Sequence, residues 1–94
     1  MTTIIDSRRL RAFKILTQTG SFTRTAVALN RTQSAISHSI AGLEDDLGVR
    51  LFLRLGRTIK ITDAGSALLV HADAILAEMV RARTSISGSD TSGE

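Results

Sequence analysis

The chain contains no cysteine, proline, tryptophan or tyrosine among its 94 residues, and its three phenylalanines are its only aromatic residues. The absence of cysteine excludes disulfides, thiolate metal sites and thiol catalysis. With a hydrophobic content of 43% and so few aromatic rings, the core is expected to be aliphatic and built mainly from helices. This length is sufficient for one small domain.

Long hydrophobic runs are also missing. No apolar stretch approaches the roughly 20 residues that a membrane-spanning helix needs. The N-terminus lacks the basic-then-apolar pattern of a secretory signal. The sequence therefore predicts a cytoplasmic protein without a membrane partner.

The pattern of an enzyme is not present either. The two histidines, His38 and His71, have no neighbouring Ser or Asp pattern that suggests a catalytic triad. Asp6, Asp63 and Asp73 do not have metal-ligand spacing, and the glycines do not match a phosphate-binding loop. We expect no catalytic residue, no metal and no cofactor.

Charge is unevenly distributed along the chain. The net charge is only +3, but residues 1–62 carry ten basic and four acidic residues, whereas residues 63–94 carry two basic and five acidic ones. This asymmetry favours a polyanionic partner for the first two thirds of the chain. The acidic run from Glu44 to Asp46 is expected to be a solvated face.

Two helices are predicted at the start of the chain. Asp6 is placed to cap the first helix, which Gly20 ends. Ser21 or Thr23 can cap a second, short helix, and Phe22 would then precede it and pack on its first turn.

A third helix follows after a very short turn. Asn30 tolerates left-handed backbone angles, and Thr32 can cap a helix that runs to about Leu47, with Gly48 just beyond it. Ala26 and Ile36 lie at the spacing at which two helices cross closely in a helix–turn–helix.

The third helix has an unusual polar face. Its apolar stripe consists of Ile36, Ile40, Leu43 and Leu47. The opposite side carries Gln33, Ser34, Ser37 and His38, and no charged residue occurs from 32 to 40. Exposed helical faces are usually charged. Neutral hydrogen-bonding groups of short reach suit the base edges of the DNA major groove instead.

A hairpin and a long helix complete the pattern. Short strand-like runs at 51–53 and 59–61 surround a turn marked by Gly56, with two arginines near its tip. Thr62 can cap the long helix. Its apolar residues repeat with alternating spacings of four and three, as in a helix that pairs with a second helix. These predicted dimerisation residues are Leu68, Ala72, Ile75, Met79, Ala82 and Ile86.

Four segments together resemble the N-terminal domain of LysR-type transcriptional regulators. They are GSFTRTA, TQSAIS, LEDDLGVRLFLR and ITDAG, and the resemblance covers roughly residues 6–86. It implies a mainly α, winged helix–turn–helix fold of three helices and a two-stranded wing, followed by a long dimerisation helix. The family's usual Gln-Pro is here Gln33-Ser34, and His38 stands where many members carry Arg.

The resemblance also implies roles for individual residues. Those facing the bases would be Gln33, Ser34, Ser37 and His38. Those near the DNA backbone or on the wing would be Thr23, Arg31, Thr32, Arg54 and Arg57. The predicted domains are a DNA-binding domain at 1–61 and a linker and dimerisation helix at 62–86. The small, polar composition of residues 87–94 predicts a disordered tail.

The resulting prediction is a sequence-specific, nucleoid-associated transcriptional regulator that binds double-stranded operator DNA as a homodimer. Full-length family members add an effector-binding domain and usually form tetramers, so no small-molecule ligand is expected within this segment. Two alternatives stay open: a winged-helix DNA binder of another family, such as a molybdate-responsive regulator, and a coiled-coil protein-interaction module.

Overall fold

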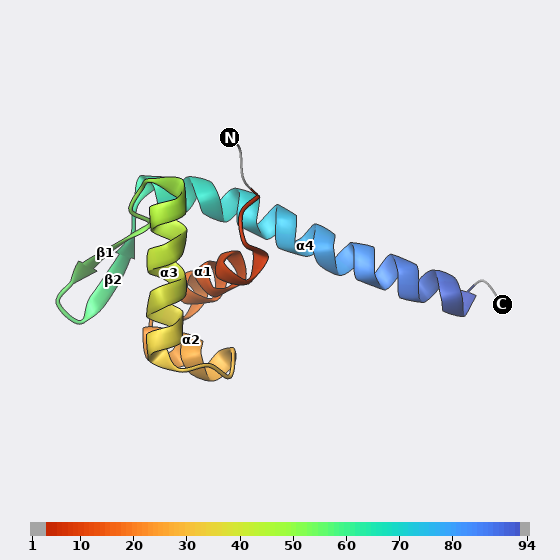
Figure 1. Ribbon diagram of the computed structural model, residues 1–94, viewed down its shortest axis with the longest axis horizontal. Coiled ribbons are helices and arrows are strands. Elements are labelled where there is room, and N and C mark those ends of the chain that lie inside the picture. The colour runs from red at the N-terminus through yellow and green to blue at the C-terminus, as the bar shows by residue number, and fades with distance from the viewer. Residues whose placement is uncertain (1–3, 93–94) are drawn as a thin grey trace.

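The computed structural model describes the backbone of residues 4–92, with side chains described as far as residue 87. Three helices form a small domain, a hairpin stands beside the third helix, and a long helix extends away on the other side (Figure 1). The elements are α1 (Ser7–Thr19), α2 (Phe22–Ala28), α3 (Gln33–Leu47), β1 (Phe52–Leu55), β2 (Thr58–Ile61) and α4 (Asp63–Ser92). The predicted fold class is confirmed.

Side-chain caps fix the starts of the first three helices. The Asp6 carboxylate accepts a hydrogen bond of 2.8 Å from the Arg8 N–H, and this bond lowers the pKa of Asp6 below its usual value. Thr32 caps α3 as predicted. Ser21, rather than Thr23, caps α2, so Phe22 is the first residue of that helix and not a residue before it.

The turn between α2 and α3 is tight because two residues close it. Asn30 adopts a left-handed conformation with φ of 54°, and the Arg31 N–H donates to the Ala26 carbonyl at 2.8 Å. Asn accepts this conformation at a lower cost than most residues. The predicted helix–turn–helix geometry is therefore present.

The core lies where α1, α3 and the start of the hairpin meet. The rings of Phe13 and Phe52 lie 5.5 Å apart between centroids, which brings the hairpin onto α1. Thr25 is buried in this otherwise apolar core, and its hydroxyl is hydrogen-bonded to the hydroxyl of Thr19 at 2.8 Å. The buried apolar residues are Leu10, Ala12, Phe13, Leu16, Ala26, Ile36, Ile40, Leu43, Leu51, Phe52 and Ala72.

One member of the acidic run departs from its predicted role. The Glu44 side chain is only 15% exposed, and its carboxylate accepts bonds from the N–H groups of Leu51 at 2.7 Å and Phe52 at 3.3 Å. The expectation of a solvated face is wrong for Glu44. The chain folds back at Gly48, which brings the first N–H groups of the hairpin onto this carboxylate. Asp45 and Asp46 are exposed, as expected.

The hairpin is tighter than predicted. The register pairs Leu55 with Thr58, so only Gly56 and Arg57 form its turn, and Gly56 supplies the positive φ of 65° that this turn needs. Arg54 pairs with Ile59 inside the strands and is not at the tip. Of the two arginines expected near the tip, only Arg57 is there.

The long helix α4 begins as predicted but ends later. The Thr62 hydroxyl accepts a bond of 3.0 Å from the Gly65 N–H, and Asp63 lies in the first turn, where the helix dipole favours it. The predicted end at residue 86 is corrected, because the helix continues to Ser92. Small polar residues weaken a helix without breaking it, and the chain has no proline to do so. Residues 93–94 of the predicted tail lie outside the described residues.

Candidate nucleic-acid interface

The first turns of α3 present the neutral surface that the sequence predicted. Gln33, Ser34 and His38 are exposed and Ser37 is half-buried, while Ile36 on the opposite side is buried in the core. The four polar residues thus share the side of α3 that does not pack against the domain. They offer amide, hydroxyl and imidazole groups, which can donate to or accept from base edges without the cost of burying a net charge.

A contact between the two helices of the helix–turn–helix orients Gln33. The Thr23 hydroxyl, in the first turn of α2, donates to the Gln33 side-chain carbonyl at 3.3 Å. Both residues are exposed. The bond holds the amide while leaving its NH₂ group and the second lone pair of its oxygen available. Thr23 is therefore placed to orient the Gln33 side chain, which adds to the backbone contact predicted for it.

The Thr32 hydroxyl already has a partner in the free protein. It accepts a bond of 3.0 Å from the Ala35 N–H as the N-cap of α3. Its exposed oxygen can still donate its proton outward, because a hydroxyl acts as donor and acceptor together. The predicted backbone-contacting residue is therefore also the residue that fixes where the recognition helix begins.

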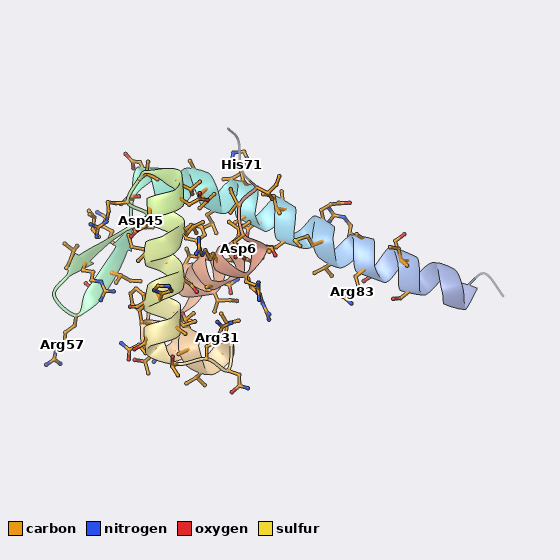
Figure 2. All side chains as sticks on the ribbon, in the orientation of Figure 1. Asp6, Arg31, Asp45, Arg57, His71 and Arg83 are labelled. Atoms are coloured by element: carbon orange, nitrogen blue, oxygen red, sulfur yellow. The ribbon has the colours of Figure 1, made fainter. Side chains whose placement is uncertain are left out.

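Exposed cations surround the neutral face. Arg31 lies in the turn before α3, and Arg57 extends from the tip of the hairpin away from the domain (Figure 2). Asp45 lies toward the opposite end of α3 from the turn that holds Arg31 (Figure 2). Positive charges beside a neutral face are the arrangement that DNA requires, because phosphates flank the grooves in which the bases are read.

Arg54 has an intramolecular partner that the sequence did not indicate. It shares the inner face of the hairpin with Phe52, and its guanidinium lies 4.4 Å from the centroid of the Phe22 ring. This cation–π contact connects the wing to the first residue of α2. The Arg54 side chain remains exposed, so its guanidinium is accessible from solvent.

Further cations near this surface were not among the predicted site residues. Arg24 is exposed on α2, and Lys60 is exposed on β2 opposite Leu53. Strand alternation gives the signal for Lys60, because the residues on either side of it, Ile59 and Ile61, face inward. A basic residue between two inward-facing residues must point outward.

The predicted dimerisation surface divides into two parts. Ala72 is fully buried in the domain's own core, and Leu68 is half-buried against it, so the expectation of a partner contact has to be revised for Ala72. The reason is that α4 lies against α1 before it leaves the domain. Farther along, the remaining predicted residues are exposed: Ile75, Met79, Ala82 and Ile86.

Helix α4 also carries the second histidine of the chain. His71 is exposed on this helix (Figure 2). Among the residues that the structure describes, no three His, Asp or Glu side chains come together as metal ligands. Within 4–92, no helix is both long and apolar enough to cross a membrane.

Comparison with protein families gives a match over most of the chain. Residues 7–66 match the family model described as bacterial regulatory helix-turn-helix protein, lysR family. An uncharacterised HTH-type transcriptional regulator of Azotobacter vinelandii is 43% identical over 91 residues, which are 95% of this chain and 63% of that protein. The chain therefore spans less than two thirds of this relative.

Solved structures show the same architecture in proteins bound to DNA. The DNA-binding domain of CbnR in its DNA complex superposes with a TM-score of 0.81 at 32% identity, covering 95% of this chain and 99% of that domain. DarR of Vibrio fischeri, also in complex with DNA, gives a TM-score of 0.87 at 27% identity, covering 98% of this chain and 32% of DarR.

Proposed function

The chain belongs to the lysR family of bacterial regulatory helix-turn-helix proteins, and from that membership we propose that it is the sequence-specific DNA-binding segment of a transcriptional regulator. The observation that carries this proposal is the neutral exposed face of α3, with Gln33 and His38 on it and exposed arginines on either side. In this proposal, α3 enters the major groove, the hairpin approaches the adjacent minor groove, and two chains bind a two-fold operator.

Base reading falls to four side chains of α3: Gln33, Ser34, Ser37 and His38. The amide of Gln33 can bond adenine in a bidentate manner, and the serine hydroxyls can donate or accept at several bases. The hydrogen bond from Thr23 already restricts the Gln33 side chain in the free protein. Gln33 therefore loses less conformational entropy when it binds DNA.

Backbone and wing contacts set the register on the DNA. Arg31 and Thr32 lie at the start of α3, where phosphates border the major groove. Arg57 extends from a wing whose base is held by the Glu44 carboxylate and by the cation–π contact of Arg54 with Phe22. An arginine gains most where the minor groove is narrow, because the negative potential is enhanced there.

Dimerisation uses the exposed part of α4. Ile75, Met79 and Ile86 are large apolar side chains that stay exposed in the single chain, by 41%, 49% and 69%. An antiparallel pair of such helices buries these residues about a two-fold axis. Two recognition helices then lie about 34 Å apart, one turn of DNA, and read the two halves of an operator.

The remainder of the regulator is proposed from the family. The chain spans 63% of the Azotobacter vinelandii relative, so a full-length form would add an effector-binding domain and a tetrameric assembly. A cytoplasmic, nucleoid-associated location follows from operator binding.

Selection from a random double-stranded DNA pool tests this proposal. The expected result is one motif with two-fold symmetry. Its base preferences should change when Gln33 or His38 is replaced by Ala, while replacement of the exposed Asp45 by Ala leaves the motif unaltered. Recovery of no motif, combined with binding to heparin that does not weaken as salt rises, would contradict DNA binding and indicate a protein-interaction module.

A further inference from the structure

The recognition helix, the wing and α4 meet at one junction, made of Glu44, the segment 50–52, Thr62 and Gly65. The Glu44 carboxylate holds the Leu51 N–H at 2.7 Å. Thr62 holds two carbonyl groups of the same segment: its N–H donates to the Leu51 carbonyl at 2.9 Å, and its hydroxyl donates to the Arg50 carbonyl at 2.6 Å. One short segment therefore connects α3 to the first turn of α4.

Gly65 makes the closest approach in this junction. It is buried, and a Cβ at this position would lie 2.5 Å from the Leu51 carbonyl oxygen and 2.6 Å from Cγ1 of Ile61. Both distances are far below van der Waals contact, and one of the opposing atoms belongs to the backbone. The missing side chain therefore lets α4 start directly against the connection between α3 and the wing.

A second contact fixes α4 farther along the helix, at Asp73. The Lys14 ammonium on α1 lies 3.2 Å from the Asp73 carboxylate, and the neighbouring Ala72 is fully buried against the core. About 12 Å of helix separates Gly65 from Asp73. A rigid helix held at two points has a defined direction, so the exposed dimerisation residues beyond Asp73 leave the domain at one fixed angle.

We propose that this junction, with Gly65 as its determining residue, sets the spacing of the operator half-sites that the dimer can read. The inference rests on the proposed function, because it requires that α4 form the dimer and α3 read the bases. Gly65 acts as a positioning residue: it touches no DNA, but it determines the angle between the helix that pairs and the helix that reads.

The size of the effect follows from the geometry. In Gly65→Ala, the added Cβ would lie about 1 Å too close to its neighbours, because ordinary carbon contacts are about 3.5 Å or more. Relieving this clash requires α4 to move by about 1 Å. About the Lys14–Asp73 contact, that shift is a rotation of about 5° over 12 Å of helix. The two-fold axis applies the same rotation to both chains, so the separation of their recognition helices departs from the spacing of about 34 Å that one turn of DNA sets.

The test compares Gly65→Ala with Gly42→Ala on the selected operator. Gly42 is a matched control, since it is also helical and a Cβ there meets only the flexible Arg9 guanidinium, at 2.9 Å. Binding is measured on the operator, on operators lengthened or shortened by one base pair, and on DNA with one half-site scrambled. Gly65→Ala is expected to weaken binding to the native spacing about tenfold, as for one mismatched contact. The ratio of its affinity for the native spacing to its affinity for an altered spacing also changes. Its binding to DNA with a single intact half-site stays equal to that of the wild-type chain.

Three results would overturn the proposal. One is unchanged spacing preference in Gly65→Ala. Another is an equal loss on the half-site DNA, which would make Gly65 a residue of fold stability alone. The third is an equal change of spacing preference in Gly42→Ala.

A second variant gives an independent reading if Gly65→Ala fails to fold. Asp73→Asn weakens the ion pair at the second contact while Ala72 stays buried, and the side chain is more than half exposed, so the fold is retained. It is expected to narrow the affinity difference between native and altered spacings by about twofold to threefold, the scale of a weak ion pair. An unchanged difference contradicts the two-point model. Failure of the proposed function is distinguishable, because the wild-type chain would then select no two-fold motif at all.

Discussion

Glu44 and Asp45 are adjacent acidic residues with opposite environments, and their replacement by alanine should separate these roles. Glu44→Ala removes the acceptor for two backbone donors, the N–H groups of Leu51 and Phe52. Asp45→Ala removes an exposed carboxylate near the end of α3, where the helix dipole disfavours negative charge. The two changes delete similar groups at neighbouring positions.

The expected loss for Glu44→Ala is worked from its two hydrogen bonds. The bond of 2.7 Å is short and charge-assisted, and the bond of 3.3 Å is longer. With about 2 kcal/mol for the first and about 1 kcal/mol for the second, the free energy of unfolding falls by about 3 kcal/mol. In a domain of this size the melting temperature then falls by about 12 to 24 °C. Asp45→Ala should change stability by no more than about 0.5 kcal/mol.

Urea and thermal unfolding followed by circular dichroism measure these differences. All variants are compared at one protein concentration, because the stability of a dimer depends on concentration. Glu44→Gln keeps an acceptor oxygen and should lose only about 1 kcal/mol. Equal stabilities of Glu44→Ala and Asp45→Ala would refute the assignment of Glu44 as the anchor of the wing.

Three further predictions concern the dimer, the wing and the first helix. Met79→Lys should yield monomers in analytical ultracentrifugation; Val70→Lys, about two and a half turns away on the opposite side of α4, should leave the dimer intact, and equal effects would contradict the proposed seam. Arg57→Ala should flatten the slope of log affinity against log salt by about 0.9 for one lost phosphate contact, whereas Arg83→Ala on α4 keeps the slope; unaltered binding by Arg57→Ala would remove the wing from the interface. The lowered pKa of Asp6 means that its ionised cap stabilises α1 above the usual carboxyl pKa and loses that contribution as pH falls through the lowered value, so the melting-temperature difference from Asp6→Ala should disappear in acid. A difference that persists there would show that the cap acts without its charge.

Local features of this protein followed from the sequence by itself. The caps at Asp6 and Thr32, the left-handed turn at Asn30 and the neutral face of α3 were all predicted and are present in the structure. Each depends on hydrogen bonds or periodicity within a few residues, so residues that are close in the sequence are sufficient to predict it. The resemblance of four short segments then gave the winged helix–turn–helix as a whole.

The roles of residues that meet across the fold were decided only by the tertiary structure. The sequence predicted that Glu44 belongs to a charged surface. In the structure the chain reverses at Gly48, and two backbone N–H groups donate to the Glu44 carboxylate. Ala72 fitted the dimer seam by spacing, but α4 lies on α1 at that point and buries it in the domain. Neither outcome can be read from periodicity, because a periodic stripe specifies that a face is covered and not which partner covers it. Here the direction of α4 decides the partner: the first part of its stripe packs against its own domain, and the part beyond Asp73 stays exposed, where we propose that a second chain binds.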